Sequence, residues 1–241
     1  MILNWVHFSL FGLVLATGLS ASRFARRDQE NWLVDALSLT NHFALIPALQ
    51  ALAVYPLLSF LLPQAKGSLD FGWVGALGFN LLIDYAWYWN HRILHSKNWL
   101  WNLHAVHHSA EDLDVLASSR NALVTPLFMV YFWLIPVAIY LLRDPAPFLL
   151  VSGISLLINF WGHTRLNLPR GSVARRILSL AIIQPEDHFW HHSADHPHCN
   201  FGTVFNFWDR FHSTWHQPGY APTKLGFHVN RPLWLKTLLP F

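Results

Sequence analysis

Five apolar stretches restrict what this chain can fold into. They cover residues 2–21, 43–62, 70–89, 122–142 and 146–163. Each is close to the ~20 residues with which a helix crosses a bilayer core, although the last is at the short limit. Only 12% of the 241 residues are charged, against about 25% in an average soluble domain. The pattern predicts an all-α, integral-membrane bundle of about four to five spans, in which Pro47 and Pro56 favour a kinked or re-entrant path for the second stretch.

The basic residues predict the orientation of this bundle. With the N-terminus outside, the loops at 22–42, 91–121 and 164–241 lie in the cytoplasm and contain fourteen of the sixteen Lys and Arg residues. Only Lys66 and Arg143 lie on the other side, as expected when positive charge collects on the cytoplasmic side. The basic residues form no stripe interleaved with aromatic residues, so a nucleic-acid partner is not indicated.

No internal repeat and no low-complexity linker divides the chain, apart from a doubled histidine motif, so residues 1–241 are predicted to form a single domain. Residues 171–184 are too short and too charged to span a membrane. This segment suits an interfacial helix with Arg175 and Arg176 at the lipid headgroups, or a buried helix of a cytoplasmic cap.

The doubled motif is His-x-x-His-His-Ser, at His104 and again at His188. Imidazole is a common ligand of Zn, Cu, Fe and Ni, and residues three and four apart share one face of a helix. The candidate ligands are His91, His95, His104, His107, His108, His163, His188, His191 and His192. One metal seldom binds more than about six nitrogen ligands, so nine histidines predict two metals in a histidine-lined cytoplasmic cap.

Three further polar residues accompany these histidines. Asp84, Tyr88, His91 and His95 follow one another at spacings of four, three and four, and so form one stripe on a helix. An ionisable residue within a span indicates a functional site, and we expect Asp84 and Tyr88 to orient ligand rings through hydrogen bonds; roles at the interface without contact to the site are the alternatives. Asn159 stands four residues before His163, where its amide could reach a metal directly or through water.

Several other kinds of metal protein fit this pattern less well. A zinc hydrolase needs about three protein ligands, and a transporter places polar ligands at mid-bilayer in several spans. A haem cytochrome with two axial histidines would leave both boxes unexplained, and the single Cys199 excludes a cysteine-rich site. His196, His198, His212 and His216 are more simply loop or packing residues, and His42 an interfacial or surface one. Two redox metals at the mouth of a membrane bundle suit oxygen activation on a lipid C–H bond.

Residues 80–215 resemble the fatty acid hydroxylase/sterol desaturase superfamily of integral-membrane di-iron enzymes. The resemblance is carried by the two boxes, by Asp84 with His91 and His95, and by the segments Asn200-Phe-Gly and Trp208-Asp-Arg-Phe. It departs from the family after the first of these boxes, where many members have Arg-x-His-x-x-Glu and this chain has Arg120-Asn121-Ala-Leu-Val-Thr, so a polar cluster is missing.

The resemblance implies a cytosolic centre of two iron ions that uses O₂ and two external electrons to hydroxylate an acyl chain, a sterol or a related lipid. A desaturase on the same scaffold is the alternative. Asn159 matches the family's additional amide or histidine ligand position. The electrons would come from a separate ferredoxin or cytochrome b5-like donor, and zinc can replace iron in purified protein because imidazole sites bind it more tightly.

Overall fold

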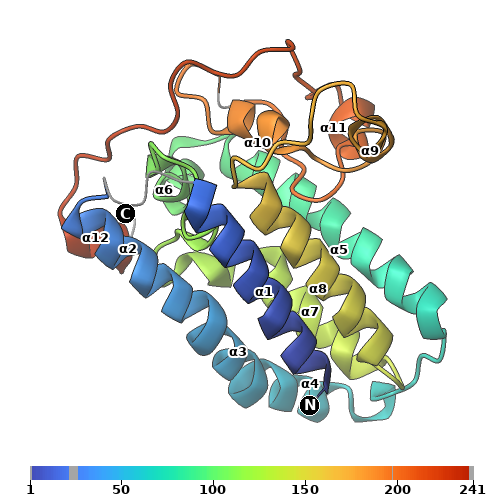
Figure 1. The fold of residues 1–241 in the computed structure, drawn as a ribbon. Helices are drawn as coiled ribbons and strands as arrows, with labels where there is room; N and C mark the ends of the chain where they lie inside the picture. Colours follow the sequence, from blue (N-terminus) through green and yellow to red (C-terminus); the bar gives the residue numbers. More distant parts are fainter. Residues whose placement is uncertain (1, 22–26, 197, 239–241) are drawn as a thin grey trace.

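The computed structural model describes residues 2–21, 27–196 and 198–238, with the side chains of the first helix described only at 10–19. This part of the chain contains helices and three isolated β-bridges but no β-strand, so the all-α prediction is confirmed. The long helices are α1 (Ile2–Ala21), a continuous helix from Gln29 to Leu61, α5 (Gly72–Leu94), α7 (Val130–Leu141) and α8 (Ala146–Gly162). Figure 1 shows them side by side, with the short helices α6, α9, α10 and α11 gathered at one end.

The second apolar stretch is part of one long helix and not a re-entrant loop. The helix contains α2 (Gln29–Thr40), α3 (Ile46–Leu49) and α4 (Tyr55–Leu61), joined by π-helical turns at Asn41–Leu45 and Gln50–Val54. A proline removes one backbone donor, and its ring collides with the carbonyl four residues earlier. For Pro47 and Pro56 that carbonyl lies within a π-helical turn, whose wider ring provides the space. The helix therefore absorbs both prolines without breaking.

Other predicted spans differ in length from the helices that form. Residues 122–129 make turns and a 3₁₀ segment (Thr125–Phe128) before α7 begins, so the fourth stretch is helical only over Val130–Leu141. At 1.5 Å per residue α7 is about 18 Å long, well short of a bilayer core of ~30 Å. Among the described residues, only Gln29–Leu61 is both long and apolar enough to cross a membrane, and residues 10–19, α7 and α8 are shorter apolar helices.

The segment 171–184 forms a helix only over α9 (Val173–Leu178), which begins where the Ser172 hydroxyl accepts a hydrogen bond from Arg175 N. The side chains of Val173, Ile177 and Leu180 are 61–73% exposed. This exposure excludes a buried helix and fits the interfacial alternative. Arg175, however, is paired with Glu186 at 2.6 Å, which leaves it less free for a headgroup.

A buried ion network joins the start of α2 to the segment after the first box. Asp35 accepts from Arg120 Nε at 2.6 Å and pairs with Arg27 at 2.7 Å, and Arg27 also reaches Asp114 at 2.8 Å. Arg27 and Arg120, two of the basic residues predicted on the cytoplasmic side, are thus paired with buried carboxylates; Arg23 and Arg26 lie outside the described residues. The His and Glu that many family members have after Arg120 are absent, and Arg120 instead pairs with Asp35 and Asn31 from the start of the long helix.

Candidate metal centre

All nine candidate histidines lie at the end of the bundle where the short helices gather. α5 carries His91 and ends just before His95, α6 (Asn98–His104) ends with His104, and His163 caps α8. The last box lies on α10 (Pro185–His191), which starts with a capping box between Gln184 and Asp187 and with proline in its first turn. Each of the nine side chains is at most 6% exposed.

The histidines form two groups, within each of which the ligand atoms lie within 4.8 Å of one another. The five-histidine cluster contains His91, His95, His104, His108 and His191. The four-histidine cluster contains His107, His163, His188 and His192. The clusters adjoin, since the ring centroids of His108 and His192 are 4.4 Å apart.

Each box contributes histidines to both clusters, so a box is not one half of a single metal site. In the first box His104 and His108 enter the five-histidine cluster and His107 enters the other. The reason is local: α6 ends at His104, and His107 and His108 lie on a following 3₁₀ turn. A 3₁₀ turn has three residues per turn in place of 3.6, so the helical spacing argument does not extend past His104.

The ring nitrogens are arranged as a metal would require. His91 Nε2 and His104 Nε2 are 2.8 Å apart, and His163 Nε2 and His188 Nε2 are 3.1 Å apart. Other ring nitrogens are buried with no hydrogen-bond partner, on His95, His104, His107, His108, His188, His191 and His192. Unpaired buried polar atoms are costly, and a cation bound in each cluster would take one ring nitrogen of each histidine as its ligand. An all-imidazole donor set suits Fe, Zn, Cu or Ni and not Mg or Ca.

Burial also keeps these rings in the form that binds metal. It lowers the pKa of His104, His107, His108, His188, His191 and His192 well below the usual 6.5, and the neighbouring rings lower it further. The rings are therefore neutral at physiological pH, and neutral imidazole is the ligand.

Backbone carbonyls fix the orientation of three rings. His91 Nδ1 donates to Phe201 O at 2.7 Å, His191 Nδ1 to Cys199 O at 2.8 Å, and His163 Nδ1 to Asn159 O at 2.9 Å. A carbonyl oxygen only accepts, so each of these rings has its proton on Nδ1 and its lone pair on Nε2. This is the usual way in which partners of a ligand ring select its tautomer.

Asp209, which the sequence reasoning missed, holds the carbonyl-bearing segment 199–202 in place. Its carboxylate accepts from Phe201 N at 2.8 Å, from Gly202 N at 2.8 Å and from the Thr214 hydroxyl at 2.7 Å. Gly202 is required there, because a Cβ would collide with the carbonyl oxygen of Phe205. The only signal in the sequence was the Trp208-Asp-Arg-Phe segment, which suggested the family but no role.

In the described part of the chain, neither Asp84 nor Tyr88 forms the expected hydrogen bond with one of the nine candidate ligands. Asp84 accepts a hydrogen bond from Trp208 Nε1 at 2.7 Å, and the Tyr88 hydroxyl is 2.9 Å from the Thr214 hydroxyl. Tyr88 is therefore linked to His91 only indirectly, through Thr214, Asp209 and Phe201. Asp84, Tyr88 and His91 do share one face of α5, but Trp208 covers Asp84 and Thr214 covers Tyr88.

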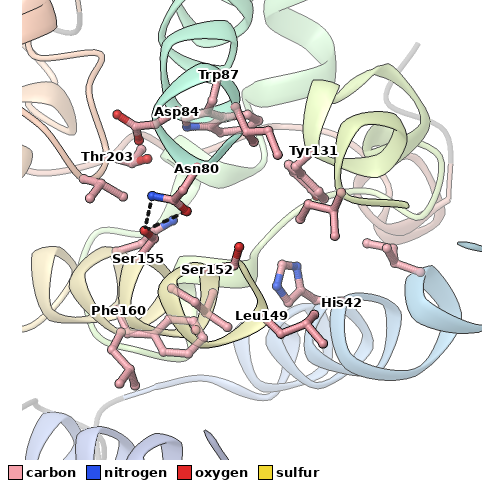
Figure 2. A pocket seen from close by; sticks show the side chains of 18 of the residues that line it. His42, Asn80, Asp84, Trp87, Tyr131, Leu149, Ser152, Ser155, Phe160 and Thr203 are labelled. Carbon is pink, nitrogen blue, oxygen red and sulfur yellow. Dashed lines mark hydrogen bonds between the residues drawn. The ribbon is translucent and has the colours of Figure 1, made fainter. Parts of the chain in front are cut away.

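A cavity of about 420 Å³ lies between the long helices and extends to the histidine end. Trp87 lines it, and its ring stacks on His91 with centroids 5.6 Å apart. Asn159 also lines it, next to the four-histidine cluster, and its Oδ1 is buried without a partner. Asp84 and Thr203 lie near this end (Figure 2), and much of the remaining wall is aliphatic or aromatic.

Two of the histidines outside the clusters, His212 and His216, pack against aromatic residues, as expected. The His212 ring stacks on Tyr88 at 5.2 Å, and His216 contacts Trp190 at 4.7 Å and His196 at 4.6 Å. His42 does not fit its predicted interfacial or surface position, because it lines the cavity.

An all-helical chain with two adjoining all-histidine clusters above an apolar cavity defines a class of metal-binding helical proteins that accommodate an apolar ligand. The family model for fatty acid hydroxylases matches residues 76–214, a region that contains all nine histidines. The chain therefore belongs to the fatty acid hydroxylase family. This confirms the resemblance drawn from the boxes.

Among its relatives, an alkylglycerol monooxygenase of Danio rerio is 34% identical over 148 residues, which cover 60% of this chain and 31% of the relative. An ornithine lipid hydroxylase of Rhizobium tropici is 30% identical over 141 residues, or 57% of this chain and 40% of the relative. Human alkylglycerol monooxygenase is 26% identical over 168 residues, which cover 63% of this chain and 36% of the relative. The matched region is thus less than half of each relative. No solved structure matches the chain.

Proposed function

We propose that this protein is an O₂-dependent membrane hydroxylase of a lipid C–H bond, with one iron ion in each histidine cluster. The observation that carries the proposal is that the two clusters adjoin each other and that two residues lining the apolar cavity, Trp87 and Asn159, contact histidines of the clusters. All nine histidines would be metal ligands, and Asn159 a further polar group beside the four-histidine cluster. The relatives are named as a monooxygenase and a hydroxylase, which favours hydroxylation over desaturation.

The reaction would convert R–H, O₂, two electrons and two protons into R–OH and water. Bound iron would supply the activation of O₂ that an unactivated C–H bond requires. The residues of the chain have other tasks. The apolar cavity would hold the lipid chain and exclude water, and Trp87 would form the wall between that chain and His91. The carbonyls of Phe201, Cys199 and Asn159 would keep the ligand rings aligned.

The outer surface of the long helices supports a membrane location. Leu52, Phe60 and Val74 are 79–82% exposed, on the continuous Gln29–Leu61 helix and on α5. Exposed apolar faces of this kind are costly in water and favourable in lipid. With the histidine end in the cytoplasm, a separate ferredoxin or cytochrome b5-like protein would deliver the electrons there.

Mass spectrometry of lipids from cells grown under ¹⁸O₂ tests the proposal. Cells with the protein should contain a lipid heavier by one ¹⁸O atom, which should be absent with His191→Ala or His163→Ala. His216→Ala is the matched control, because His216 is outside both clusters, and it should retain the product. A lipid lighter by two hydrogens would show a desaturase instead, and an unchanged lipid profile would refute both.

A further inference from the structure

The cavity contains a group of neutral polar side chains far from the histidine clusters. Asn80 on α5 and Ser155 on α8 are joined by contacts of 3.0 and 3.2 Å. Figure 2 shows the Ser152 hydroxyl and the His42 ring directed into the same space. All four line the cavity. We call Asn80, Ser152, Ser155 and His42 the polar zone.

Two members of the polar zone are without an intramolecular partner. Neither Ser152 nor His42 forms a hydrogen bond with any other residue of the described part of the chain. Asn80 and Ser155 satisfy each other, yet the Asn80 amide retains a second N–H and a second lone pair. The polar zone therefore offers both donors and acceptors to a ligand.

The polar zone lies at a defined depth below the histidines. Asn80 precedes His91 by eleven residues on α5, and Ser155 and Ser152 precede His163 by eight and eleven on α8. At 1.5 Å per residue these separations are about 12–16 Å. The wall between the two levels includes Ile83, Leu156 and Phe160. The one carboxylate there, that of Asp84, is already bonded to Trp208.

A plain hydrocarbon chain is a poor match for such a cavity. It would leave the Ser152 hydroxyl and a His42 ring nitrogen unpaired in an apolar environment, which costs free energy. A ligand with a hydrogen-bonding group at this depth would satisfy them, and sites of this kind discriminate strongly against analogues that lack the group. The members of the polar zone are neutral donors and acceptors and not paired charges, so the group is a neutral one.

We propose that the cavity selects an elongated lipid with a neutral hydroxyl or carbonyl group about 12–16 Å from the carbon beside the metals. Binding of that group in the polar zone would determine which carbon of the chain lies at the histidine clusters. The statement about the oxidised carbon rests on the proposed function, whereas the statement about binding does not.

Binding of a matched pair of probes tests this proposal. Purified, metal-loaded protein in micelles is titrated with radiolabelled 1-hexadecanol and with hexadecane. We expect the alcohol to bind more tightly, and Ser152→Ala and His42→Phe each to reduce its affinity roughly 2- to 10-fold, the range of one net hydrogen bond. Hexadecane should bind the variants at least as well as the wild type. Ser59→Ala is the control, because the Ser59 hydroxyl bonds to Tyr55 O and does not line the cavity.

Two results would overturn the proposal. Equal affinity for both probes would show that water alone satisfies the polar zone. A preference for the alcohol that survives in both variants would place the hydroxyl elsewhere. Metal content and melting temperature of each variant identify any loss caused by misfolding, and Ser152→Ala is small enough to fold. Because no turnover is needed, the preference can be present even if no lipid is oxidised, and the two proposals therefore fail separately.

Discussion

At the scale of single residues, we expect the two clusters to differ in how much metal binding they lose when one histidine is replaced. Substituting His163 would leave three ligands in the four-histidine cluster, and substituting His95 would leave four in the other. We expect wild-type protein reconstituted with iron to hold about two metals per chain, His163→Ala about one, and His95→Ala an intermediate number. Elemental analysis of purified protein measures this.

His216→Ala should bind as much metal as the wild type, since its ring packs on Trp190 outside both clusters. A wild-type preparation that never exceeds one metal per chain would contradict the two-metal arrangement. Equal loss from His163→Ala and His95→Ala would contradict the division into clusters of four and five.

Asp209 is the residue on which the alignment of His91 depends most. Asp209→Asn replaces an acceptor by a donor opposite the backbone N–H groups of Phe201 or Gly202. The Phe201 carbonyl should then hold His91 less firmly, and metal affinity or turnover should fall about 10- to 100-fold, as is typical for partners of ligand rings. Asp112→Asn, at an exposed pair with Arg165, should change neither. Unchanged metal affinity and turnover in the Asp209 variant would show that the segment is held without it.

Spacing predicted the nine histidines, because imidazoles repeated in one pattern have few other uses. It could not assign them to clusters, since that depends on where α6 ends and the 3₁₀ turn begins. It also predicted hydrogen bonds from Asp84 and Tyr88 to ligand rings. Both residues share a face with His91, but they bond to Trp208 and Thr214, which are 120 or more residues away in the sequence. Contacts between distant segments are not encoded in local periodicity.

At the scale of helices and segments, the buried ion network is the main polar link between α2 and the first box. Asp35 neutralises Arg120, which is only 2% exposed, and also contacts Arg27. Asp35→Ala would leave both guanidinium groups with less compensation, and removing one partner of a buried pair typically costs about 3–5 kcal/mol. Denaturant unfolding in micelles, followed by tryptophan fluorescence, measures the loss.

The exposed pair between Asp70 and Arg143 provides the comparison, with side chains 59% and 66% exposed. Asp70→Ala should cost about 0–1 kcal/mol because water screens that pair. The double variant Asp35→Leu with Arg120→Met should recover part of the stability, since it removes both charges together. A loss in Asp35→Ala no larger than that in Asp70→Ala would show that the network does not stabilise the fold.

Apolar runs predicted which segments become long helices but not their ends. The first stretch and α1 agree closely, whereas the second is the later half of a 33-residue helix whose first turns are too polar to be recognised by hydropathy. Asp35 and Ser38 are buried there because they bond to Arg120 and to the Asn121 carbonyl. A polar turn with distant partners cannot be distinguished from a loop in the sequence.

At the scale of the whole molecule, α6 and α10, which carry histidines of both boxes, and the loop between α4 and α5, which contains Lys66, lie at opposite ends of the bundle (Figure 1). They are separated by the length of α5, about 34 Å for its 23 residues, which is close to the thickness of a bilayer core. A membrane around the long helices would therefore place these two ends on different sides, and the distribution of basic residues predicts that Lys66 is outside and the clusters are in the cytoplasm.

Single cysteines at exposed positions test this orientation. Lys66→Cys should react with a membrane-impermeant maleimide in intact cells, and Asp195→Cys should react only after permeabilisation, because both positions are exposed at opposite ends. The chain without an added cysteine is the control. Burial raises the pKa of the Cys199 thiol to about 12, so the native cysteine should label little. Reaction of both variants in intact cells would place both ends on one side and refute the membrane orientation, even if both histidine clusters bind metal.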